Sequence, residues 1–296
     1  MKNQKMAYVY AIMAVLIWST VATAFKLALK YLDFLQLLFF SGLVSCCVLL
    51  VLMIINREFK ELTKLTFKEY VKSALLGFLN PFLYYVVLFK AYSLLPAQEA
   101  QPLNYTWPIM LVLLSIPLLN QKIKIKSIVS IAISFFGVLI ISTQGDILGF
   151  GFTNLFGAIL ALSTAVIWAL FWILNMKDKR KETPKLFLNF IFGLVYIFIA
   201  TVTFSKITTP HINGILSASY IGLFEMGITF VLWSKALELS YSTAKVSKFI
   251  YLVPFLSLIT VYFILGEKIL IPTIIGLVFI IIGIVLEQLK LTINKI

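Results

Sequence analysis

Glu225 is the residue in this sequence that is best placed to do chemistry. It lies about ten residues into a long apolar run, so at 1.5 Å per residue it sits near the middle of a hydrocarbon layer roughly 30 Å thick. An ionised carboxylate at that depth costs roughly 3 kcal/mol or more, so it must face a wet cavity, pair with a cation or be protonated. We predict that Glu225 binds a substrate. A carboxyl group that is buried for packing and bonded to a neighbouring Ser or Thr is the alternative.

The first half of the chain carries a polar residue at the matching depth. At a spacing of 145 (225 − 80), Gly77 falls on Gly222 and Asn80 falls on Glu225. Transporters built from two repeats hold their substrate where the repeats meet, near the middle of the membrane. We therefore expect Asn80 to face the same cavity as Glu225.

The apolar run at 97–119 is interrupted by three prolines and several polar residues. Each internal proline leaves a backbone carbonyl without its helical donor, which lipid tolerates only beside protein or water. Gln101, Asn104 and Tyr105 lie around the first two of these prolines. We expect these three side chains to line a cavity wall.

Two tryptophans occupy matching positions in the two halves. Val15–Trp18 and Ala165–Trp168 are similar at a spacing of 150 (168 − 18). Both Trp18 and Trp168 lie deep in their apolar runs, away from the interfacial belt where tryptophan is commonest. Together with Tyr84 they could stack on a flat or apolar substrate, and helix packing is the alternative.

Lys248 is a basic residue in the second turn of the apolar run at 243–265. A lysine at this depth can extend its ammonium group to the lipid headgroups. Alternatively, it is a counter-ion for Glu225 or for a carboxylate on the substrate. The sequence leaves both possibilities open.

The composition excludes an ordinary soluble domain. Hydrophobic residues make up 61% of the chain and charged residues 12%, whereas about 25% of residues are charged in soluble domains. Apolar runs of about 20 residues recur along the chain, and each is long enough to cross a bilayer as a helix. Lysines in the short connections account for much of the net charge of +13, as expected for cytoplasmic loops, and this argues against nucleic-acid binding.

Catalysis and metal binding are not expected. His211 is the only histidine, and the adjacent Cys46 and Cys47 point about 100° apart on a helix, which suits neither a metal nor a disulfide. The sequence lacks paired intramembrane aspartates, an H-E-x-x-H pattern and a phosphate-binding glycine loop. We expect no catalytic residue, no metal and no cofactor. The alternatives to a transporter are a lipid-modifying membrane enzyme and a channel.

The chain contains an internal duplication. Tyr105–Ile140 matches Tyr251–Leu286 at a spacing of 146 (251 − 105), with a proline and a glycine at equivalent places. We predict an all-α integral membrane protein with two halves, 1–145 and 146–296, of five transmembrane helices each. The predicted spans are 7–25, 34–55, 70–92, 97–119, 127–143, 154–175, 186–204, 216–239, 243–265 and 270–289.

The distribution of lysine and arginine predicts the orientation of these spans. Basic residues concentrate in the connections that follow the second, fourth and sixth spans, which places both termini in the cytoplasm. Because each half has an odd number of helices, the second half must be inverted in the membrane relative to the first. Two inverted halves can exchange an inward-facing state for an outward-facing one. The sequence therefore predicts an alternating-access carrier in the cell (inner, cytoplasmic) membrane.

The chain resembles the EamA-type drug/metabolite transporters over essentially its whole length. The likeness rests on the repeat, on its proline and glycine offsets, and on Leu119–Lys122 against Leu265–Lys268. Members usually carry a Gly-Glu pair at the ends of the fourth and ninth spans. Gly266–Glu267 fits this pattern and Asn120–Gln121 departs from it. Leu103–Pro108 also resembles the aromatic amino acid exporter branch.

The resemblance implies a central cavity formed by the first, third, fourth, sixth, eighth and ninth spans. It also implies export of amino acids or other metabolites, in some members by exchange with protons. We therefore expect a secondary transporter that moves a small metabolite, foremost an amino acid or a related compound, out of the cell. Glu225 and Asn80 would contact its polar groups, and Glu225 would carry the proton if transport is proton-coupled. The expected partners are this substrate and the lipid bilayer, with the chain acting as a monomer or weak dimer.

Overall fold

The computed structural model describes residues 2–119, 125–148, 153–205, 210–241, 246 and 248–288. Every regular element within these ranges is a helix, which confirms the all-α prediction. Six of the described helices are long and apolar enough to cross a membrane. These are Gln4–Ala28, Phe34–Ile55, Phe67–Leu94, Leu155–Asn175, Glu182–Phe204 and Ile212–Ala236. Shorter apolar helices accompany them, so the count of ten spans stays a prediction.

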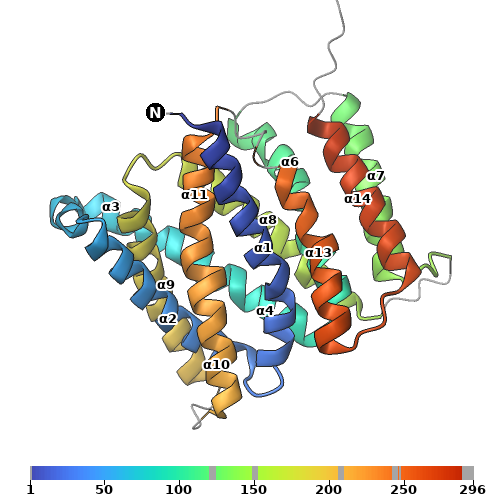
Figure 1. The fold of residues 1–296 in the computed structure, drawn as a ribbon, viewed down its shortest axis with the longest axis horizontal. Coiled ribbons are helices and arrows are strands. Elements are labelled where there is room, and N and C mark those ends of the chain that lie inside the picture. The colour runs from blue at the N-terminus through green and yellow to red at the C-terminus, as the bar shows by residue number, and fades with distance from the viewer. Residues whose placement is uncertain are drawn as a thin grey trace, which may run out of the picture.

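Helices follow one another throughout the described chain (Figure 1). The first part contains α1 (Gln4–Ala28), α2 (Phe34–Ile55), η1 (Phe59–Lys64), α3 (Phe67–Gly77), η2 (Phe78–Leu83), α4 (Tyr84–Leu94), α5 (Ala97–Asn104), α6 (Trp107–Leu119) and α7 (Ile125–Ser142). The second part contains α8 (Leu155–Met176), α9 (Glu182–Phe204), α10 (Ile212–Tyr220), η3 (Ile221–Ile228), α11 (Thr229–Leu239), η4 (Lys248–Tyr251), α13 (Leu252–Thr260), η5 (Val261–Leu265) and α14 (Ile271–Gln288).

Short polar side chains start several of these helices. Asn3 caps α1 by accepting a hydrogen bond from the amide of Met6, and Asn154 caps α8 in the same way. The Asp33 side chain accepts a hydrogen bond from the amide of Gln36, and the Gln36 side chain accepts one from the amide of Asp33. This reciprocal pair is a capping box. These caps satisfy amide groups that the first turn of a helix leaves without partners. They explain why the apolar runs begin as helices where the sequence predicts them.

Two long helices are interrupted by stretches of irregular helix. Between α3 and α4, η2 is a stretch of π-helix in which Asn80 has non-helical dihedral angles (φ −150°, ψ 119°) and Pro81 has no N–H to donate. Between α10 and α11, η3 is a longer π-helix that contains Glu225. The Thr229 hydroxyl donates to the Phe224 carbonyl inside this irregular stretch. Single π-helical turns within α-helices are frequent at functional sites.

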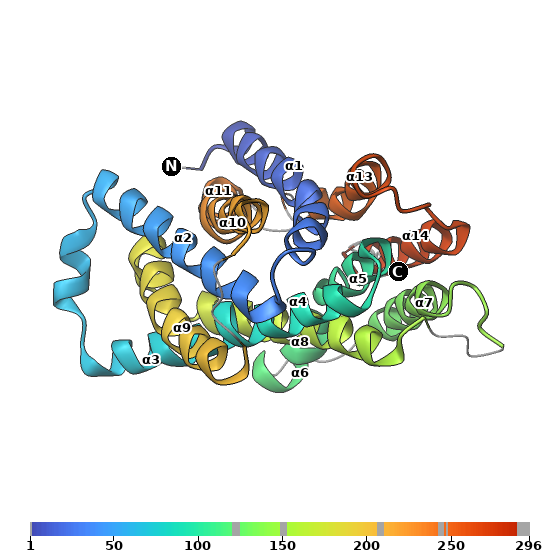
Figure 2. The ribbon, with the colours of Figure 1, turned by 90° about the horizontal axis from the view of Figure 1, so that it is seen from below.

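Helices of the first part of the chain pack mainly against helices of the second part. Helix α1 packs on α11 and α13, and α8 packs on α4 and α6. Helix α2 packs on η3 and α9, and α9 packs on η2. Figure 2 shows α1 and α11 on one side of the bundle and α4 and α8 on the other. Each of these contacts joins the first part of the chain to the second, so neither part has a separate core.

The helices α7 and α14 form a close antiparallel pair (Figure 1). A Cβ atom on Gly137 would collide with the backbone of Gly276, and one on Gly283 would collide with Ser130. Residues late in α7 thus meet residues early in α14, and the reverse, which requires the two helices to run in opposite directions. The absence of side chains at these glycines lets the backbones touch, as is common between helices in membranes.

Candidate functional site

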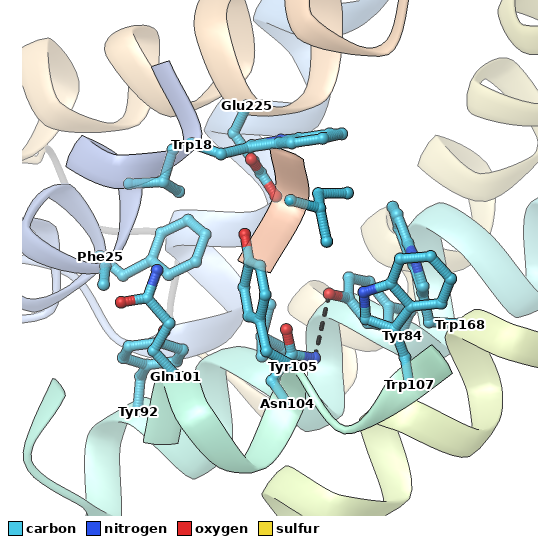
Figure 3. A pocket seen from close by; sticks show the side chains of 14 residues that line it. Trp18, Phe25, Tyr84, Tyr92, Gln101, Asn104, Tyr105, Trp107, Trp168 and Glu225 are labelled. Atoms are coloured by element: carbon cyan, nitrogen blue, oxygen red, sulfur yellow. Dashed lines mark hydrogen bonds between the residues drawn. The ribbon is translucent and has the colours of Figure 1, made fainter. Parts of the chain in front are cut away.

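A cavity lies among the helices near the middle of their length (Figure 3). Helices α1, α4, α5, α6 and α8 contribute to its walls, together with η3 and η4. The lining residues are Trp18, Val21, Ala22, Phe25, Tyr84, Leu88, Tyr92, Gln101, Asn104, Tyr105, Trp107, Trp168, Glu225 and Ile250.

Glu225 is the only acidic residue among those that line the cavity. Its side chain is 7% exposed, and its Oε1 accepts a hydrogen bond of 3.1 Å from the hydroxyl of Tyr85. Its Oε2 is buried without a hydrogen-bond partner among the described residues. The indole of Trp18 lies beside this carboxylate, and the hydroxyl of Tyr105 points toward it (Figure 3). None of the described ion pairs involves Glu225.

Two amide side chains from α5 form the polar wall opposite Glu225. The Asn104 Nδ2 donates to the Tyr84 hydroxyl (3.2 Å) and to Thr164 Oγ1 on α8 (2.7 Å). Both amide hydrogens of Asn104 are therefore used, and its Oδ1 is the atom left for a ligand. The Gln101 Oε1 accepts a hydrogen bond from Ser257 on α13. Both amides are thus oriented by residues of the second half of the chain.

Aromatic rings make up most of the remaining wall. The ring centroids of Trp168 and Tyr84 are 4.7 Å apart, and those of Tyr84 and Tyr85 are 4.8 Å apart. Trp18 packs on Trp233 at 5.5 Å on the other side of the cavity. These rings pack against one another, in agreement with a role in helix packing. Trp18, Tyr84 and Trp168 also face the cavity. Rings fixed in this way present flat faces at a small entropic cost.

The structure brings together seven of the nine residues that the sequence singles out. Trp18, Tyr84, Gln101, Asn104, Tyr105, Trp168 and Glu225 line one cavity. Asn80 lies elsewhere: it is completely buried in η2, and neither atom of its amide has a hydrogen-bond partner among the described residues. Lys248 begins η4, and its side chain lies outside the described part of the chain.

Several lining residues carry no signal in the sequence. Phe25 and Tyr92 belong to ordinary apolar runs, in which a ring that faces a cavity looks like a ring that faces a neighbouring helix. Trp107 lies in the run interrupted by prolines, next to the residues that the sequence predicted for a cavity wall. Tyr85, the hydrogen-bond partner of Glu225, lies 140 residues away from it along the chain. Only the packing of distant helices identifies these side chains.

The connection after η5 holds the helix that carries the amide wall. The Glu267 carboxylate accepts from the amides of Ala97 (3.2 Å) and Gln98 (3.5 Å) in the first turn of α5. The Gln98 Nε2 returns a bond of 2.9 Å to the Lys268 carbonyl. Gly266 ends η5 with a φ of 69°, a left-handed conformation that favours glycine. This accounts for the Gly266–Glu267 pair, whereas Asn120–Gln121 lies outside the described residues.

A second group of buried charged residues lies in the connection between α8 and α9. The Asp178 carboxylate forms ion pairs with Arg180 and Lys72. Its Oδ2 lies 2.6 Å from Arg180 Nη2 and 3.4 Å from Lys72 Nζ. Arg180 also donates to the Glu69 carbonyl on α3. Burial by itself raises the pKa of Asp178, but the hydrogen bonds and charge of Arg180, with the charge of Lys72, lower it to about 2. This group links two helices and has no unpaired carboxylate oxygen to offer.

Comparisons with known proteins give the same picture over the whole chain. The model of the EamA-like transporter family matches residues 5–143 and 155–287. An uncharacterized transporter from Clostridium kluyveri is 29% identical over 290 residues, which cover 94% of this chain and 92% of that protein. The uncharacterized transporter YoaV from Bacillus subtilis is 26% identical, with 95% and 96% covered. One solved crystal structure shares the fold with a TM-score of 0.69 at 19% identity, covering 96% of this chain and 97% of that one.

Proposed function

Because this chain belongs to the EamA-like transporter family, we propose that it is a secondary transporter that carries a small metabolite across the cell membrane by alternating access. Glu225 is the observation that carries the proposal. A buried carboxylate with one unpartnered oxygen is costly in a membrane helix, and here it opens onto a cavity built by both halves of the chain. Glu99 also keeps one oxygen without a described partner, but it does not line this cavity, so it is the position of Glu225 in the cavity wall that points to a ligand.

The antiparallel pairing of α7 and α14 supports an inverted relation between the two halves. These helices hold equivalent places, since Gly137 of α7 corresponds to Gly283 of α14 in the duplication. Ser134 donates to the carbonyl of Ile280, its own equivalent at a spacing of 146 (280 − 134). A residue that contacts its own equivalent lies close to a two-fold axis, and the antiparallel course of the helices puts that axis across their length. Such halves can exchange their conformations and open the cavity to either side.

Equivalent close contacts elsewhere support the same relation. A Cβ atom on Gly77 would collide with the Asn189 carbonyl, and one on Gly222 would collide with the Ser41 carbonyl. In the duplication Gly77 matches Gly222, while Ser41 lies in α2 and Asn189 in α9, the second long helix of each half. The interrupted helix of each half thus packs closely against the second helix of the other half. Rocking of one half against the other would move both cavity walls together.

The substrate that suits this cavity is small and amphipathic, such as an amino acid or a related compound. Glu225, Gln101 and Asn104 would contact its polar groups, while Trp18 and Trp168 would contact its apolar part. We propose transport out of the cell through the cytoplasmic membrane, with both termini in the cytoplasm and the chain acting as a monomer or weak dimer. The basic connections support this orientation, and exposed apolar residues on the outer helices, such as those of α9, suit contact with lipid.

A labelling experiment tests the inverted arrangement. Cys46 and Cys47 are changed to serine, and a single cysteine is then placed at position 122 or at position 268. We expect a membrane-impermeant maleimide to label position 268 from outside intact cells and position 122 only in inverted vesicles. Labelling of both positions from the same side would rule out inverted halves and alternating access between them.

A transport assay tests the carrier itself. Purified protein is first screened by thermal shift against amino acids and common metabolites, because a ligand that binds the native state raises its melting temperature. The best ligand is then measured in proteoliposomes for exchange between internal unlabelled and external labelled molecules. We expect saturable uptake of the labelled molecule that is accelerated by unlabelled substrate inside the vesicles. A channel would instead show flux that does not saturate and no such acceleration.

A further inference from the structure

We propose that the cavity recognises its substrate by a protonated amine attached to an aromatic or apolar body, and not by a carboxylate. This inference rests on the proposed function and narrows its substrate class. It comes from the charge, the hydrogen-bond groups and the shape of the walls around Glu225.

The described walls of the cavity carry a single charged residue, and it is acidic. Among the fourteen lining residues, Glu225 is acidic and none is Lys, Arg or His. A ligand ammonium group that reaches Glu225 supplies a counter-ion and forms a charge-assisted hydrogen bond with Oε2. A ligand carboxylate in the same space would meet the like charge of Glu225, and none of the described lining residues offers it a cation. Exclusion of water from this site strengthens both the attraction and the repulsion.

The hydrogen-bond groups around the cavity lead to the same ligand. Glu225 Oε2 and Asn104 Oδ1 are acceptors, because Tyr85 occupies Oε1 and the Asn104 hydrogens are already donated to Tyr84 and Thr164. An ammonium group is a pure donor with up to three hydrogens, so it matches these acceptors. The Gln101 amide nitrogen is a neutral donor that suits a hydroxyl or carbonyl oxygen and does not balance a negative charge.

The aromatic rings complete a cage for a cation with an apolar body. Trp18 lies beside the carboxylate of Glu225, and the Tyr105 hydroxyl points toward it, so an ammonium group bound there also lies close to aromatic rings (Figure 3). Contacts between a cation and an aromatic face are strongest where water is excluded. The rings of Trp168 and Tyr84, 4.7 Å apart, lie further along the cavity and can stack on an aromatic or aliphatic body.

A set of three ligands with one shared skeleton tests the proposal. Phenethylamine carries only an amine, phenylalanine carries an amine and a carboxylate, and 3-phenylpropionate carries only a carboxylate. Binding to the detergent-purified, full-length wild-type protein is measured at pH 7.5 by quenching of tryptophan fluorescence, because Trp18, Trp107 and Trp168 line the cavity. We expect phenethylamine to bind about tenfold or more tighter than phenylalanine, and 3-phenylpropionate to bind weakest. The ranking uses only the wild-type protein, so it does not depend on a variant that folds.

A matched pair of variants then assigns the preference to its residue. We expect Glu225→Gln to reduce phenethylamine affinity about tenfold or more, and Glu238→Gln to leave it unchanged. Glu238 is an exposed carboxylate that pairs with Lys235 at 2.8 Å, away from the cavity. Equal or tighter binding of phenylalanine or 3-phenylpropionate, or binding of none of the three ligands, would overturn the proposal. So would an amine preference that survives Glu225→Gln.

Exchange in proteoliposomes separates this inference from the proposed function. If the protein exchanges amino acids or acids but not amines, the transporter stands and the amine preference is wrong. If phenethylamine binds in the expected order but no substrate is exchanged, the amine site stands and the carrier is wrong.

Discussion

Two carboxylates in this protein are equally buried and have opposite surroundings. Glu225 and Asp178 are each 7% exposed. Asp178 receives Arg180 at 2.6 Å and Lys72 at 3.4 Å, so both of its oxygens are occupied. Glu225 is contacted only by neutral donors, the Tyr85 hydroxyl and the Trp18 indole, and keeps one oxygen without a described partner. Asp178 thus fixes its connection against α3, whereas Glu225 keeps an acceptor in the cavity wall.

The locations of the two groups explain this difference. Asp178 lies in a connection, where long basic side chains can reach it and a partner two residues away is enough to fix it. Glu225 lies in an irregular stretch inside a long apolar helix, where a permanent counter-ion would be as costly to bury as the carboxylate. The variants below distinguish an open carboxylate from a saturated one, in order of expected effect.

The largest effect is expected from Glu225→Gln. Loss of the charge should reduce substrate exchange in proteoliposomes roughly 100-fold, because a charge pair with a desolvated ligand contributes about 3 kcal/mol. The melting temperature of the unliganded protein should stay the same or rise, since a buried charge has been removed. Glu238→Gln serves as the control. Exchange at the wild-type rate in Glu225→Gln would mean that the carboxylate is structural.

For Asp178→Asn we expect lower stability and unchanged ligand binding, the reverse of Glu225→Gln. The substitution leaves Arg180 and Lys72 without their anion and should destabilise the protein by about 2 kcal/mol. Ligand affinity should not change, because none of these residues lines the cavity. A thermal melt and a binding titration on the same preparation measure the two effects. Weaker ligand binding with an unchanged melt would contradict the structural role of Asp178.

A smaller effect is expected from Tyr85→Phe. The ring remains and the hydrogen bond to Glu225 Oε1 is lost, which is worth about 1 kcal/mol and corresponds to roughly a fivefold change in ligand affinity. Tyr196→Phe, on the outer helix α9, is the control because its ring packs on Phe78 and Phe82 away from the cavity. An unchanged affinity in Tyr85→Phe would show that this bond does not position Glu225 for the ligand.

The smallest effect is expected when the pH is varied near neutrality, where the contribution of Asp178 to stability should not change. The pKa of Asp178 is lowered to about 2 in the folded protein, below the value of about 3.9 for an unfolded Asp. Its stabilising contribution is therefore complete above about pH 4 and is lost as the pH falls toward 2. The difference in melting temperature between the wild type and Asp178→Asn should be constant from pH 8 to about pH 4 and shrink below it. A difference that shrinks already between pH 8 and pH 5 would indicate a different titrating group.

Much of the fold could be predicted from the sequence. The helix predicted at 34–55 is α2 (Phe34–Ile55), and the one predicted at 154–175 is α8 (Leu155–Met176). Apolar runs of sufficient length, bounded by polar caps, have no alternative in lipid to forming helices. The position of Glu225 within its run likewise follows from counting residues.

The prediction for Asn80 shows where such counting stops. A spacing of 145 residues sets the depth of Asn80 but not the direction of its side chain. The chain leaves helical geometry at Asn80, whereas Glu225 lies within a continuous π-helix, so a regular sequence spacing does not give the two side chains the same surroundings. Glu225 lines the cavity and Asn80 is buried in the packing of η2.

The sequence by itself determined that this chain forms apolar helices and that a carboxylate lies deep among them. Only the tertiary structure decided which side chains surround that carboxylate. Tyr85, Trp18 and Tyr105 come from helices that meet η3 through packing alone. Helix formation depends on neighbours a few residues apart and can be read along the chain. Contacts between distant helices depend on which of many similar apolar faces fit together, and the order of residues does not reveal that fit.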